Sequence, residues 1–465
     1  MQLGDLLDDC SLDVVTSSIE IIDVEVDSRQ CGPGSLFVAL PGASHDGLDY
    51  ASEAVMRGAS CVIATSNATL DVPVVVVPAS QLHALLSHVA STIVGHPEMK
   101  TKLVGVTGTN GKTSVTTMVA QLARSLGWNG ATIGTLTNER TTPAPPELFR
   151  TLAELVDAFD PAKAHSVVAL EVSSHGLDQR RVEGLRFHVA AFTNLTHDHL
   201  DYHVTMERYF AAKASLFSSE HAQRAVIWSD DPYGARLAAM TTLPVTEVSR
   251  ADASDVTGTL TGTTFFWRGH LVNSPLVGAY NVDNALMAMS IMASLGADEA
   301  GVAHAMGDVT PVDGRFNVLE GVEATVVVDY AHTPDGLRRL LEDVRALAPN
   351  ARLITVFGCG GDRDRLKRPE MGLVASTSSD VTIVTSDNPR SESPDAIIDA
   401  VLEGVVEGRD VRRERDRRQA IALALSLANA GDVVVIAGKG HETTQVIGDA
   451  VTPFDDRLVA REFLK

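Results

Sequence analysis

The sequence contains 465 residues, of which 45% are hydrophobic, and its formal net charge at pH 7 is −22. Such a chain usually divides into two or three domains, because single cores rarely grow beyond about 250–300 residues. The negative charge argues against nonspecific binding to nucleic acid or to an anionic membrane. No apolar run is long enough to insert in a membrane, and the four scattered cysteines form no metal-binding or disulfide pattern. We therefore expect a cytoplasmic protein.

Apolar strands and helices alternate along most of the chain. A first part of short elements ends with a predicted helix, Gln81–Val94, followed by Gly-His-Pro. In the second part, the predicted strands are Leu103–Val106, Ser166–Leu170, Val189–Thr193 and Ala225–Ser229, and the helices are Thr113–Leu126 and Asn281–Leu295. In the third part, the strands are Thr325–Asp329, Arg352–Gly358, Val381–Ser386 and Asp432–Ala437, and the helices are Thr333–Leu347 and Pro394–Gly404. We expect an α/β protein with domains at residues 1–98, 99–311 and 312–465, the second with a mainly parallel, doubly wound sheet and the third Rossmann-like.

The strongest local motif lies between a predicted strand and a predicted helix, where residues 105–113 read GVTGTNGKT. Glycines let backbone N–H groups surround phosphate oxygens at the start of a helix. Lys112 would then reach the β- and γ-phosphates of ATP, and Thr113 would bind Mg²⁺. The spacing departs from the strict Walker pattern, because Val106 stands five residues before Gly111. The alternative interpretation is a glycine-rich turn with a chance lysine.

Residues Gly108–Ser114 resemble the ATP loop of the Mur ligases and of their folylpolyglutamate synthetase relatives. Further motifs favour the Mur ligases, and in particular the members that form a tripeptide. These motifs are Glu171–Val182, Thr193–His203, Tyr209–Lys213, Gly278–Asn284, Asp313–Phe316, Asp329–Pro334, Gly358–Asp364, Asp387–Arg390 and Gly438–Glu442. They cover nearly the whole chain and are weakest in the first hundred residues.

The resemblance implies an ATP-dependent ligase of peptidoglycan synthesis that adds meso-diaminopimelate to UDP-N-acetylmuramoyl-L-alanyl-D-glutamate. The γ-carboxylate of the D-glutamate would attack ATP to give an acyl phosphate, which the incoming amine would displace. Residues 1–98 would bind the UDP substrate, 99–311 would form the ATP-binding P-loop domain, and 312–465 would bind the amino acid. We expect a monomer that uses ATP and two Mg²⁺. The alternatives are a lysine-adding enzyme of the family, a folylpolyglutamate synthetase, or a nucleotide-binding regulator without ligase activity.

The resemblance also assigns the catalytic and nucleotide-binding residues. Lys112, Glu171, His199 and Lys213 would be catalytic, with Lys213 carbamylated to N6-carboxylysine. Thr113, Glu171, His199 and the Lys213 carbamate would bind metal, whereas His197 and His203 are interpreted as ordinary polar loop residues. The residues expected to contact ATP are Gly108, Thr109, Asn110, Gly111, Lys112, Thr113, Ser114, Asn281, Arg315 and Asp329.

Two further sets of residues would bind the other substrates. For the UDP-linked dipeptide they are Ser28, Arg29, His45, Thr141, Thr142, Ser173, Gln179 and Arg181, of which Arg181 suits a carboxylate because a guanidinium can pair with it bidentately. For the amino acid they are Arg363, Asp387, Asn388, Arg390, Gly438 and Glu442. Arg363 belongs to a basic run with Arg365, Lys367 and Arg368, whose alternative interpretation is a solvated face. Arg390 would distinguish meso-diaminopimelate from lysine, unless it only caps the helix that begins near Pro394.

Overall fold

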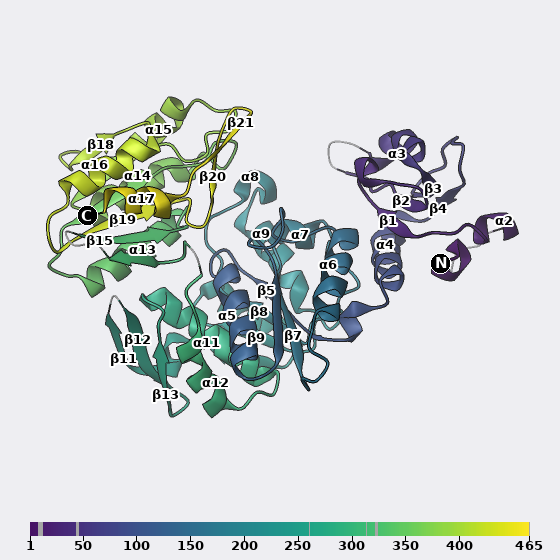
Figure 1. Ribbon diagram of the computed structural model, residues 1–465, viewed down its shortest axis with the longest axis horizontal. Helices are drawn as coiled ribbons and strands as arrows, with labels where there is room; N and C mark the ends of the chain where they lie inside the picture. The colour runs from purple at the N-terminus through teal and green to yellow at the C-terminus, as the bar shows by residue number, and fades with distance from the viewer. Residues whose placement is uncertain (8–12, 43–45, 260, 313, 321–323, 465) are drawn as a thin grey trace.

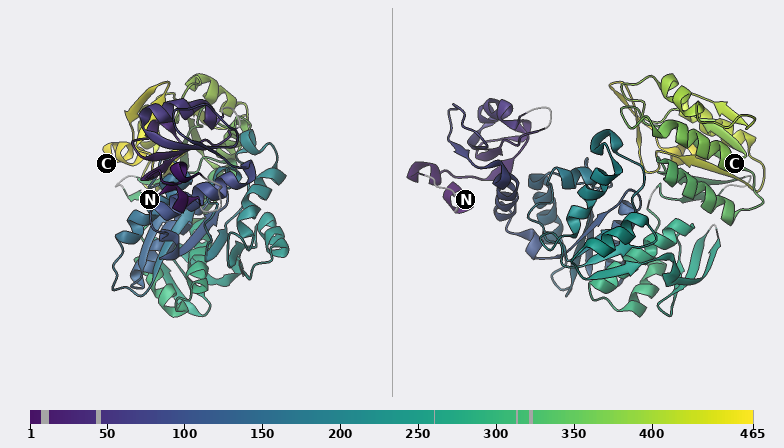
Figure 2. Two further views of the ribbon diagram at one scale, coloured as in Figure 1. Left: turned by 90° about the vertical axis from the view of Figure 1, so that its right-hand side faces the viewer. Right: turned by 180° about the vertical axis from the view of Figure 1, so that it is seen from behind.

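The structure is a computed structural model that describes residues 1–7, 13–42, 46–259, 261–312, 314–320 and 324–464. It contains three α/β units: an N-terminal unit (α1–α4 and β1–β4), a central unit (β5–β13 with α5–α12) and a C-terminal unit (β14–β21 with α13–α17) (Figure 1). The N- and C-terminal units both lie against the central unit, and the right-hand view of Figure 2 shows them well apart from each other. The expected α/β class with three units is confirmed, whereas the domain boundaries stay a prediction.

The N-terminal unit is a parallel sheet with strand order β1-β2-β3-β4. Its strands are β1 (Asp23–Glu25), β2 (Ser35–Val38), β3 (Ala59–Ala64) and β4 (Val74–Val76), and its helices are α1 (Leu3–Leu6), α2 (Val14–Ser17), α3 (Ala51–Arg57) and α4 (Ala79–Ile93). The predicted helix Gln81–Val94 corresponds to α4. Its apolar face, with Leu82 and Leu86, belongs to the same buried cluster as Leu148 and Phe149 of helix α6 in the central unit. The two units therefore share an apolar core.

The central unit is built on a six-stranded parallel sheet with the order β10-β9-β8-β5-β7-β6. The strands are β5 (Lys102–Thr107), β6 (Asn129–Ile133), β7 (Ser166–Glu171), β8 (Val189–Phe192), β9 (Ala225–Trp228) and β10 (Val245–Val248). The helices are α5 (Lys112–Ser125), α6 (Pro145–Asp157), α7 (Ser174–Asp178), α8 (Leu200–His203), α9 (Met206–Ala214), α10 (Pro232–Met240), α11 (Ala279–Ser294) and α12 (Glu299–Ala305). Helices α5, α11 and α12 share a buried cluster with one face of the sheet, and α6, α7, α9 and α10 with the other. Burial on both faces explains why the strands are continuous apolar runs.

Strand β5 occupies the point where the strand order reverses, because it pairs with both β7 and β8. Open α/β sheets bind ligands at such a switch point, outside the carboxyl ends of the strands. The glycine motif follows β5 directly, so the fold places it at this position.

A small antiparallel sheet in the central unit was not predicted. It consists of β11 (Ala253–Thr259), β12 (Gly262–Trp267) and β13 (His270–Ser274). On β12, Thr263, Phe265 and Trp267 are buried and alternate with exposed residues, as in a sheet with one solvated face.

The C-terminal unit has a second six-stranded sheet, with the order β14-β15-β19-β16-β17-β18. Strand β14 (Asn317–Glu320) pairs antiparallel with β15 (Ala324–Asp329), and β15, β16 (Leu353–Phe357), β17 (Val381–Val384), β18 (Val411–Arg413) and β19 (Asp432–Ala437) are parallel. Helices α13 (Pro334–Leu347), α14 (Lys367–Ser378) and α15 (Pro394–Leu402) cover one face, and α16 (Arg417–Leu427) and α17 (Asp456–Phe463) cover the other. The expected Rossmann-like arrangement is confirmed. A hairpin of β20 (Thr444–Ile447) and β21 (Ala450–Pro453) extends from it.

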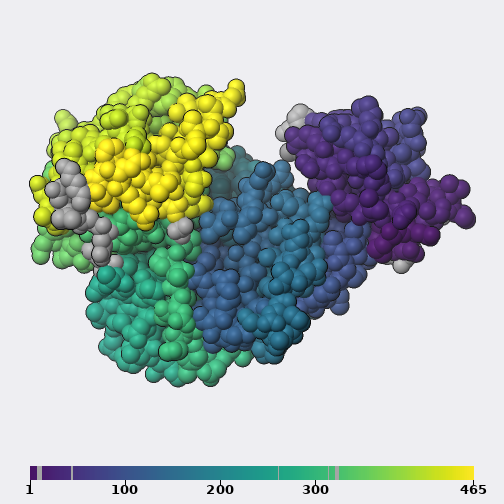
Figure 3. Space-filling model, viewed as in Figure 1, coloured from purple at the N-terminus to yellow at the C-terminus, as the bar shows by residue number. Residues whose placement is uncertain are grey.

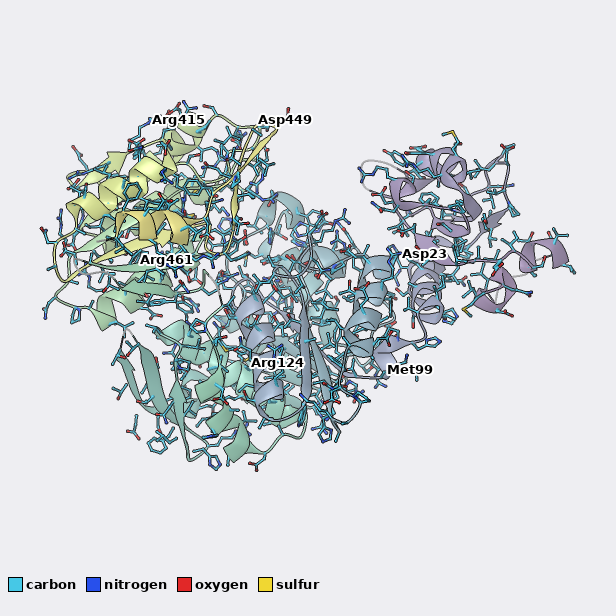
Figure 4. The ribbon with its side chains drawn as sticks, in the orientation of Figure 1. Asp23, Met99, Arg124, Arg415, Asp449 and Arg461 are labelled. Carbon is cyan, nitrogen blue, oxygen red and sulfur yellow. The ribbon has the colours of Figure 1, made fainter. Side chains whose placement is uncertain are left out.

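The space-filling view shows an open gap between the N- and C-terminal units, with the central unit at its base (Figure 3). Asp449, at the tip of the β20–β21 hairpin, lies on the side of the C-terminal unit that faces this gap (Figure 4).

Two carboxylates of the N-terminal unit, Asp23 and Glu25, form ion pairs with Arg150 of α6 in the central unit, at 2.9 and 2.8 Å. Across the described residues, no helix combines the length and the apolar character needed to span a membrane.

Candidate active site

The loop between β5 and α5 is a phosphate-sized cradle that requires glycine. Gly108 and Gly111 have φ angles of +150° and +86°. A Cβ atom on Gly108 would lie 1.9 Å from Thr193 Oγ1, and one on Gly111 would lie 2.6 Å from Asn284 Oδ1. The free N–H groups at the start of α5 face the same loop, and they favour an anion together with the helix dipole. This geometry favours the ATP-site interpretation over a chance glycine turn.

Residues at the end of β8 hold the loop in place. Asn194 O accepts from Thr109 N at 2.9 Å, Asn194 Oδ1 accepts from Asn110 N at 2.9 Å, and Thr193 Oγ1 donates to Asn110 O at 2.6 Å. The Asn110 Nδ2 atom is buried without a partner among the described residues. Buried polar groups are normally paired, so an orphaned donor in this loop indicates a missing ligand.

Two lysines converge on the same carbonyl of the loop. Lys112 Nζ and Lys213 Nζ donate to Gly108 O at 2.9 and 2.8 Å. Lys213, on α9, is only 1% exposed, and its Nζ lies 4.7 Å from the centre of the Tyr209 ring. Burial, reinforced by the charge of Lys112, lowers the pKa of Lys213 well below its usual value. A lowered pKa makes the neutral amine accessible, and only the neutral amine can react with CO₂.

Glu171 ends β7 beside the first residues of α5. Its side chain is buried, and Oε2 accepts from Thr113 Oγ1 at 2.9 Å. Oε1 accepts from Thr135 N at 3.0 Å. A hydroxyl and a carboxylate in contact at a phosphate loop are the hard oxygen donors that Mg²⁺ prefers. No group of three or more His, Cys, Asp or Glu side chains with an arrangement that could hold a metal ion was found in the part of the chain that the structure describes. Mg²⁺ commonly takes one or two carboxylates together with substrate phosphates, so Thr113 and Glu171 fit such an ion.

His199 lies at the edge of an aromatic cluster around Lys213. It occupies the N-cap position before α8 with φ of +53°, and its ring centre is 4.9 Å from that of His175. Burial, together with the nearby His175 and the two lysines, lowers the pKa of His199 to about 3 although Asp198 opposes this. The imidazole is therefore neutral at pH 7, which is the form that binds a metal ion.

The interpretation as an ordinary polar loop residue is wrong for His203, which belongs to α8, whereas for His197, which does lie in a loop, it stays a prediction. His203 is 4% exposed at the end of α8, and its ring stacks on Tyr209 at 5.1 Å. His197 Nε2 lies 3.2 Å from Asp364 Oδ2 of the C-terminal unit, so it forms a contact between units.

A cavity between the central and C-terminal units joins the phosphate loop to the predicted ATP residues. It is lined by Asn110, Gly111, Ser114, Asn284, Arg315 and Asp329. It shares Trp228, Tyr280, Asp283 and Arg339 with a neighbouring cavity of about 540 Å³. The cavity at the phosphate loop measures about 70 Å³, and only the neighbouring one falls in the range of roughly 300–1,000 Å³ that is typical of small-molecule sites.

The polar groups in this cavity come from both units. Asp329 Oδ2 accepts from Tyr280 OH at 3.0 Å and from Phe316 N at 2.7 Å, and burial raises the pKa of Asp329. Arg315 lies 4.5 Å over the ring of Tyr330, and its Nε atom is buried without a partner among the described residues. Asn281 is buried and donates from Nδ2 to Val277 O at 2.7 Å, whereas Asn284, one turn later, lines the cavity. Sequence reasoning did not single out Asn284, although it lies in the same motif.

The residues expected to bind the muramoyl dipeptide form one cluster next to Glu171. Thr142 Oγ1 donates to Glu171 O at 2.9 Å and lies 3.0 Å from Ser173 Oγ, and Thr141 Oγ1 lies 3.1 Å from Thr135 Oγ1. Arg181 donates to Thr142 O at 2.7 Å and to Gln179 Oε1 at 2.5 Å.

The remaining predicted residues of this set belong to the N-terminal unit. Ser28 is buried and donates to Glu53 Oε2 at 2.8 Å, whereas Arg29 is exposed and pairs with Asp27 at 2.6 Å. Arg140 of the central unit contributes to the lowered pKa of Asp27, after the larger effect of the Arg29 hydrogen bond, so the two units approach each other here. His45 lies outside the described residues.

Five of the six residues expected to bind the amino acid meet at the carboxyl ends of β17 and β19. Asn388 Nδ2 donates to Glu442 Oε2 at 2.7 Å, and Arg390 Nη1 donates to Gly361 O at 2.8 Å. A Cβ atom on Gly438, whose φ is +113°, would lie 2.8 Å from Asp387 Oδ2. Burial raises the pKa of Asp387.

The basic run after β16 divides into residues with different environments. Arg363 is exposed beside the amino-acid residues. Arg365 and Arg368 both pair with Glu392, at 3.0 and 2.8 Å, and therefore stabilise the unit internally. Lys367 is buried near Asp198. Its charge helps to lower the pKa of the Asp198 carboxyl, whereas burial of that carboxyl would raise its pKa. The solvated-face alternative does not describe Lys367 or Arg368, which are 6% and 3% exposed.

A phosphate loop at the switch point of a parallel sheet, closed from above by a second α/β unit, defines a nucleotide-dependent enzyme. Three family models match the chain: "Mur ligase family, catalytic domain" at residues 20–107, "Mur ligase middle domain" at 106–292, and "Mur ligase, glutamate ligase domain" at 314–440. The chain belongs to the Mur ligase family, whose members are ATP-dependent amide ligases.

Individual relatives match over nearly their full length. The UDP-N-acetylmuramoyl-L-alanyl-D-glutamate–2,6-diaminopimelate ligase of Gloeobacter violaceus is 43% identical, over 100% of this chain and 98% of the relative. The protein of the same name from Geobacillus kaustophilus is 44% identical, over 96% of this chain and 95% of the relative. A solved structure of a ligase with that name has a TM-score of 0.68 and 31% identity, covering 100% of this chain and 98% of that one.

Proposed function

We propose that this ligase adds meso-diaminopimelate to the D-glutamate of UDP-N-acetylmuramoyl-L-alanyl-D-glutamate, with hydrolysis of ATP to ADP and phosphate, in peptidoglycan synthesis. One observation carries this proposal beyond the family. Asp387, Asn388, Arg390 and Glu442 gather at one edge of the C-terminal sheet and offer both signs of charge. Such a site suits an amino acid with ammonium and carboxylate groups at both ends.

The first chemical step activates the D-glutamate carboxylate as an acyl phosphate. Lys112 stabilises the charge that develops on the γ-phosphate, because its Nζ already lies over the loop. Arg315 adds a second positive charge from the C-terminal unit. Its buried Nε donates to no acceptor among the described residues. Asp329 holds the N–H of Phe316, the residue after Arg315, and thereby orients this segment towards the nucleotide.

Metal ions would supply charge neutralisation for the phosphates. We propose two Mg²⁺, one held by Thr113 and Glu171 and the other by His199 and the carbamate of Lys213. The carbamate converts a buried cation into an anion, which relieves the repulsion between Lys213 and Lys112.

The N-terminal and central units hold the acceptor substrate. Arg181 pairs with the α-carboxylate of D-glutamate, and its contacts with Thr142 and Gln179 fix its position. Ser28, Arg29 and His45 hold the uridine diphosphate. The free buried thiols of Cys31, Cys61 and Cys359 fit the reducing cytoplasm in which these substrates are made, and we propose that the enzyme acts there as a monomer.

An assay of phosphate release tests the proposal. Purified protein, ATP, Mg²⁺ and the UDP-linked dipeptide are supplied with meso-diaminopimelate, L-lysine, L-ornithine or D-alanyl-D-alanine, with Lys112→Ala as the inactive control. We expect rapid release only with meso-diaminopimelate. Preference for lysine would make the protein a lysine-adding member of the family, and release with glutamate and a folate in place of the UDP substrate would indicate a folylpolyglutamate synthetase.

A further inference from the structure

Lys439 is a buried charge in the amino-acid site that the proposed reaction does not use. It follows β19, and its side chain is 0% exposed. Its Nζ donates to Glu442 Oε2 at 2.8 Å, to Thr444 O at 2.7 Å and to Asn388 Oδ1 at 3.2 Å. Asp387 Oδ1 lies 3.9 Å away. All three donor positions of the ammonium are therefore occupied by the protein, so Lys439 does not contact a substrate itself.

We propose that Lys439 is a positioning residue for the amino-acid site: its ammonium fixes Glu442 and Asn388 so that Glu442 Oε1 faces an ammonium group of the incoming amino acid. This inference rests on the proposed function. Glu442 Oε2 accepts from both Lys439 and Asn388, so that oxygen is fully engaged. No hydrogen bond to Oε1 is found within the described residues, and the Glu442 side chain is 28% exposed. The protein thus holds the carboxylate at Oε2, and Oε1 can accept a hydrogen bond from a substrate.

The same lysine determines the orientation of the Asn388 amide. Asn388 Oδ1 accepts from Lys439 Nζ and from Val446 N at 3.0 Å, which leaves Nδ2 as the donor to Glu442. Without the ammonium, Oδ1 loses one of two donors. The amide–carboxylate contact that aims Glu442 then loses its support.

The contacts of Lys439 also reach the arginine that selects the substrate. Thr444, whose carbonyl it binds, begins β20. Two residues further on, Val446 O accepts from Arg390 N at 3.1 Å, and Gly448 N donates to Arg390 O at 2.7 Å. The backbone of Arg390, with φ of +51°, is therefore held by the strand that Lys439 anchors. One buried ammonium thus supports two of the loops that form the site.

Charge explains why the position requires a cation and not only a hydrogen-bond donor. Asp387 and Glu442 are two carboxylates near one buried point, and burial raises the pKa of Asp387 while Lys439 opposes this. Arg417 opposes this rise too, so a neutral side chain at position 439 would leave one nearby cation in place of two, and Glu442 would turn towards water. The affinity for the ammonium of the amino acid would fall, whereas the ATP and UDP-substrate sites lie on other loops.

Steady-state kinetics of Lys439→Met test this inference. The assays use whichever amino acid the wild-type protein uses best. The assignment of meso-diaminopimelate is therefore tested separately, by comparing the amino acids with the wild-type protein. We expect the KM for the amino acid to rise at least tenfold. The KM values for ATP and for the UDP substrate are expected to stay within twofold, and kcat to fall less than KM rises. A buried pair in the same unit, Thr355 Oγ1 and Ser379 Oγ at 2.7 Å, supplies the control variant Thr355→Val.

Two results would overturn the inference. The first is an unchanged KM for the amino acid in a folded Lys439→Met protein. The second is an equal loss of activity with all three substrates, if Thr355→Val loses the same amount of activity when its thermal stability falls by the same amount. A double variant adds a readout that a purely structural lysine would not affect: in a Glu442→Gln background, Lys439→Met is expected to raise KM by a clearly smaller factor than in the wild-type background, because much of its effect runs through Glu442. Independent, multiplicative effects contradict the inference. If Lys439→Met does not fold, Lys439→Gln replaces it in the same cycle.

Discussion

The buried ion pair between Arg417 and Asp456 allows a prediction of both stability and function. Both side chains are 0% exposed, and they form two hydrogen bonds of 2.8 and 2.7 Å. Asp456→Ala leaves the guanidinium buried without its partner, a change that typically costs about 3–5 kcal/mol. For a domain of roughly 150–250 residues, each kcal/mol lowers Tm by about 2–4 °C, so we expect a decrease of roughly 6–20 °C. Differential scanning calorimetry of the C-terminal transition measures it.

Two further variants serve as comparisons for Asp456→Ala. The exposed pair of Arg412 and Asp410, at 3.1 Å, is the matched control, and Asp410→Ala is expected to leave Tm nearly unchanged. Replacing both buried partners, as Arg417→Met with Asp456→Leu, is expected to recover most of the lost stability. A decrease in Tm for Asp456→Ala no larger than that of Asp410→Ala would refute the reasoning.

The pair also acts on the amino-acid site. Arg417 donates to Ala437 O at 3.0 Å and to Ser386 O at 3.4 Å. These carbonyls directly precede Gly438 and Asp387, so Arg417 ties together the two strand ends that carry the site. We therefore expect the stable double variant to show a raised KM for the amino acid, because its stability is restored but this tie is not.

Four further predictions concern single residues. Lys112→Ala is expected to lower phosphate release by about a hundredfold or more in a folded protein, because it removes charge from the transition state; near-normal turnover would contradict the ATP assignment. Lys213→Ala is expected to be inactive and partly rescued by short carboxylates, as measured by phosphate release with added acetate or formate. Arg390→Ala is expected to raise the KM for meso-diaminopimelate and reduce its preference over lysine, and an unchanged ratio of kcat/KM values would exclude this role. Burial raises the pKa of Asp343 to about 6, so its contribution to stability is present below pH of about 4 and is lost as the pH rises through about 6. Asp343→Asn is expected to flatten this part of the stability curve, and thermal unfolding at pH 4 to 7 checks it.

The parallel sheets could be predicted from the sequence because they are buried on both faces. Continuous apolar runs such as Val381–Val384 and Asp432–Ala437 are strands in the structure at nearly their expected bounds. The antiparallel β11–β13 sheet was missed. Strands β12 and β13 alternate buried and exposed residues, and β11 has no buried residue, so no apolar run marks them. The β20–β21 hairpin was missed for the same reason, since its four residues in β21 are all exposed.

The candidate site could be predicted only where a motif names its residues. The glycine loop, Glu171 and Lys213 meet as expected, because each follows or packs on the strands at the switch point. The roles of Asn194 and Lys439 could not be read from local sequence. Asn194 acts on a loop 84 positions away, and Lys439 acts on Asn388 at a separation of 51. Such pairings depend on strand order, which local patterns do not specify.

The two interfaces of the central unit differ in kind, and this difference indicates which one moves. Towards the N-terminal unit, α4 and α6 share an apolar cluster. Towards the C-terminal unit, Val277 and Tyr280 join the apolar cluster of Phe316, and the other contacts are polar: Tyr280 OH with Asp329, Tyr280 N with Asp343 at 3.2 Å, and His197 with Asp364. Polar contacts can be exchanged for water at small cost, whereas separating an apolar core exposes it. We therefore expect the C-terminal unit to separate from the central unit more readily than the N-terminal unit does.

Opening of the C-terminal unit has a direct consequence for catalysis. Arg315 and Asp329 reach the nucleotide cavity from one side, and Asn110 and Asn284 reach it from the other. ATP that contacts both sides binds the closed arrangement better than the open one, and so shifts the population towards closure. We expect closure to carry the amino-acid site towards Glu171 and Lys213 as well. Nucleotide binding would then bring the amine to the carboxylate only when ATP is present to activate it, which would limit ATP hydrolysis without amide formation.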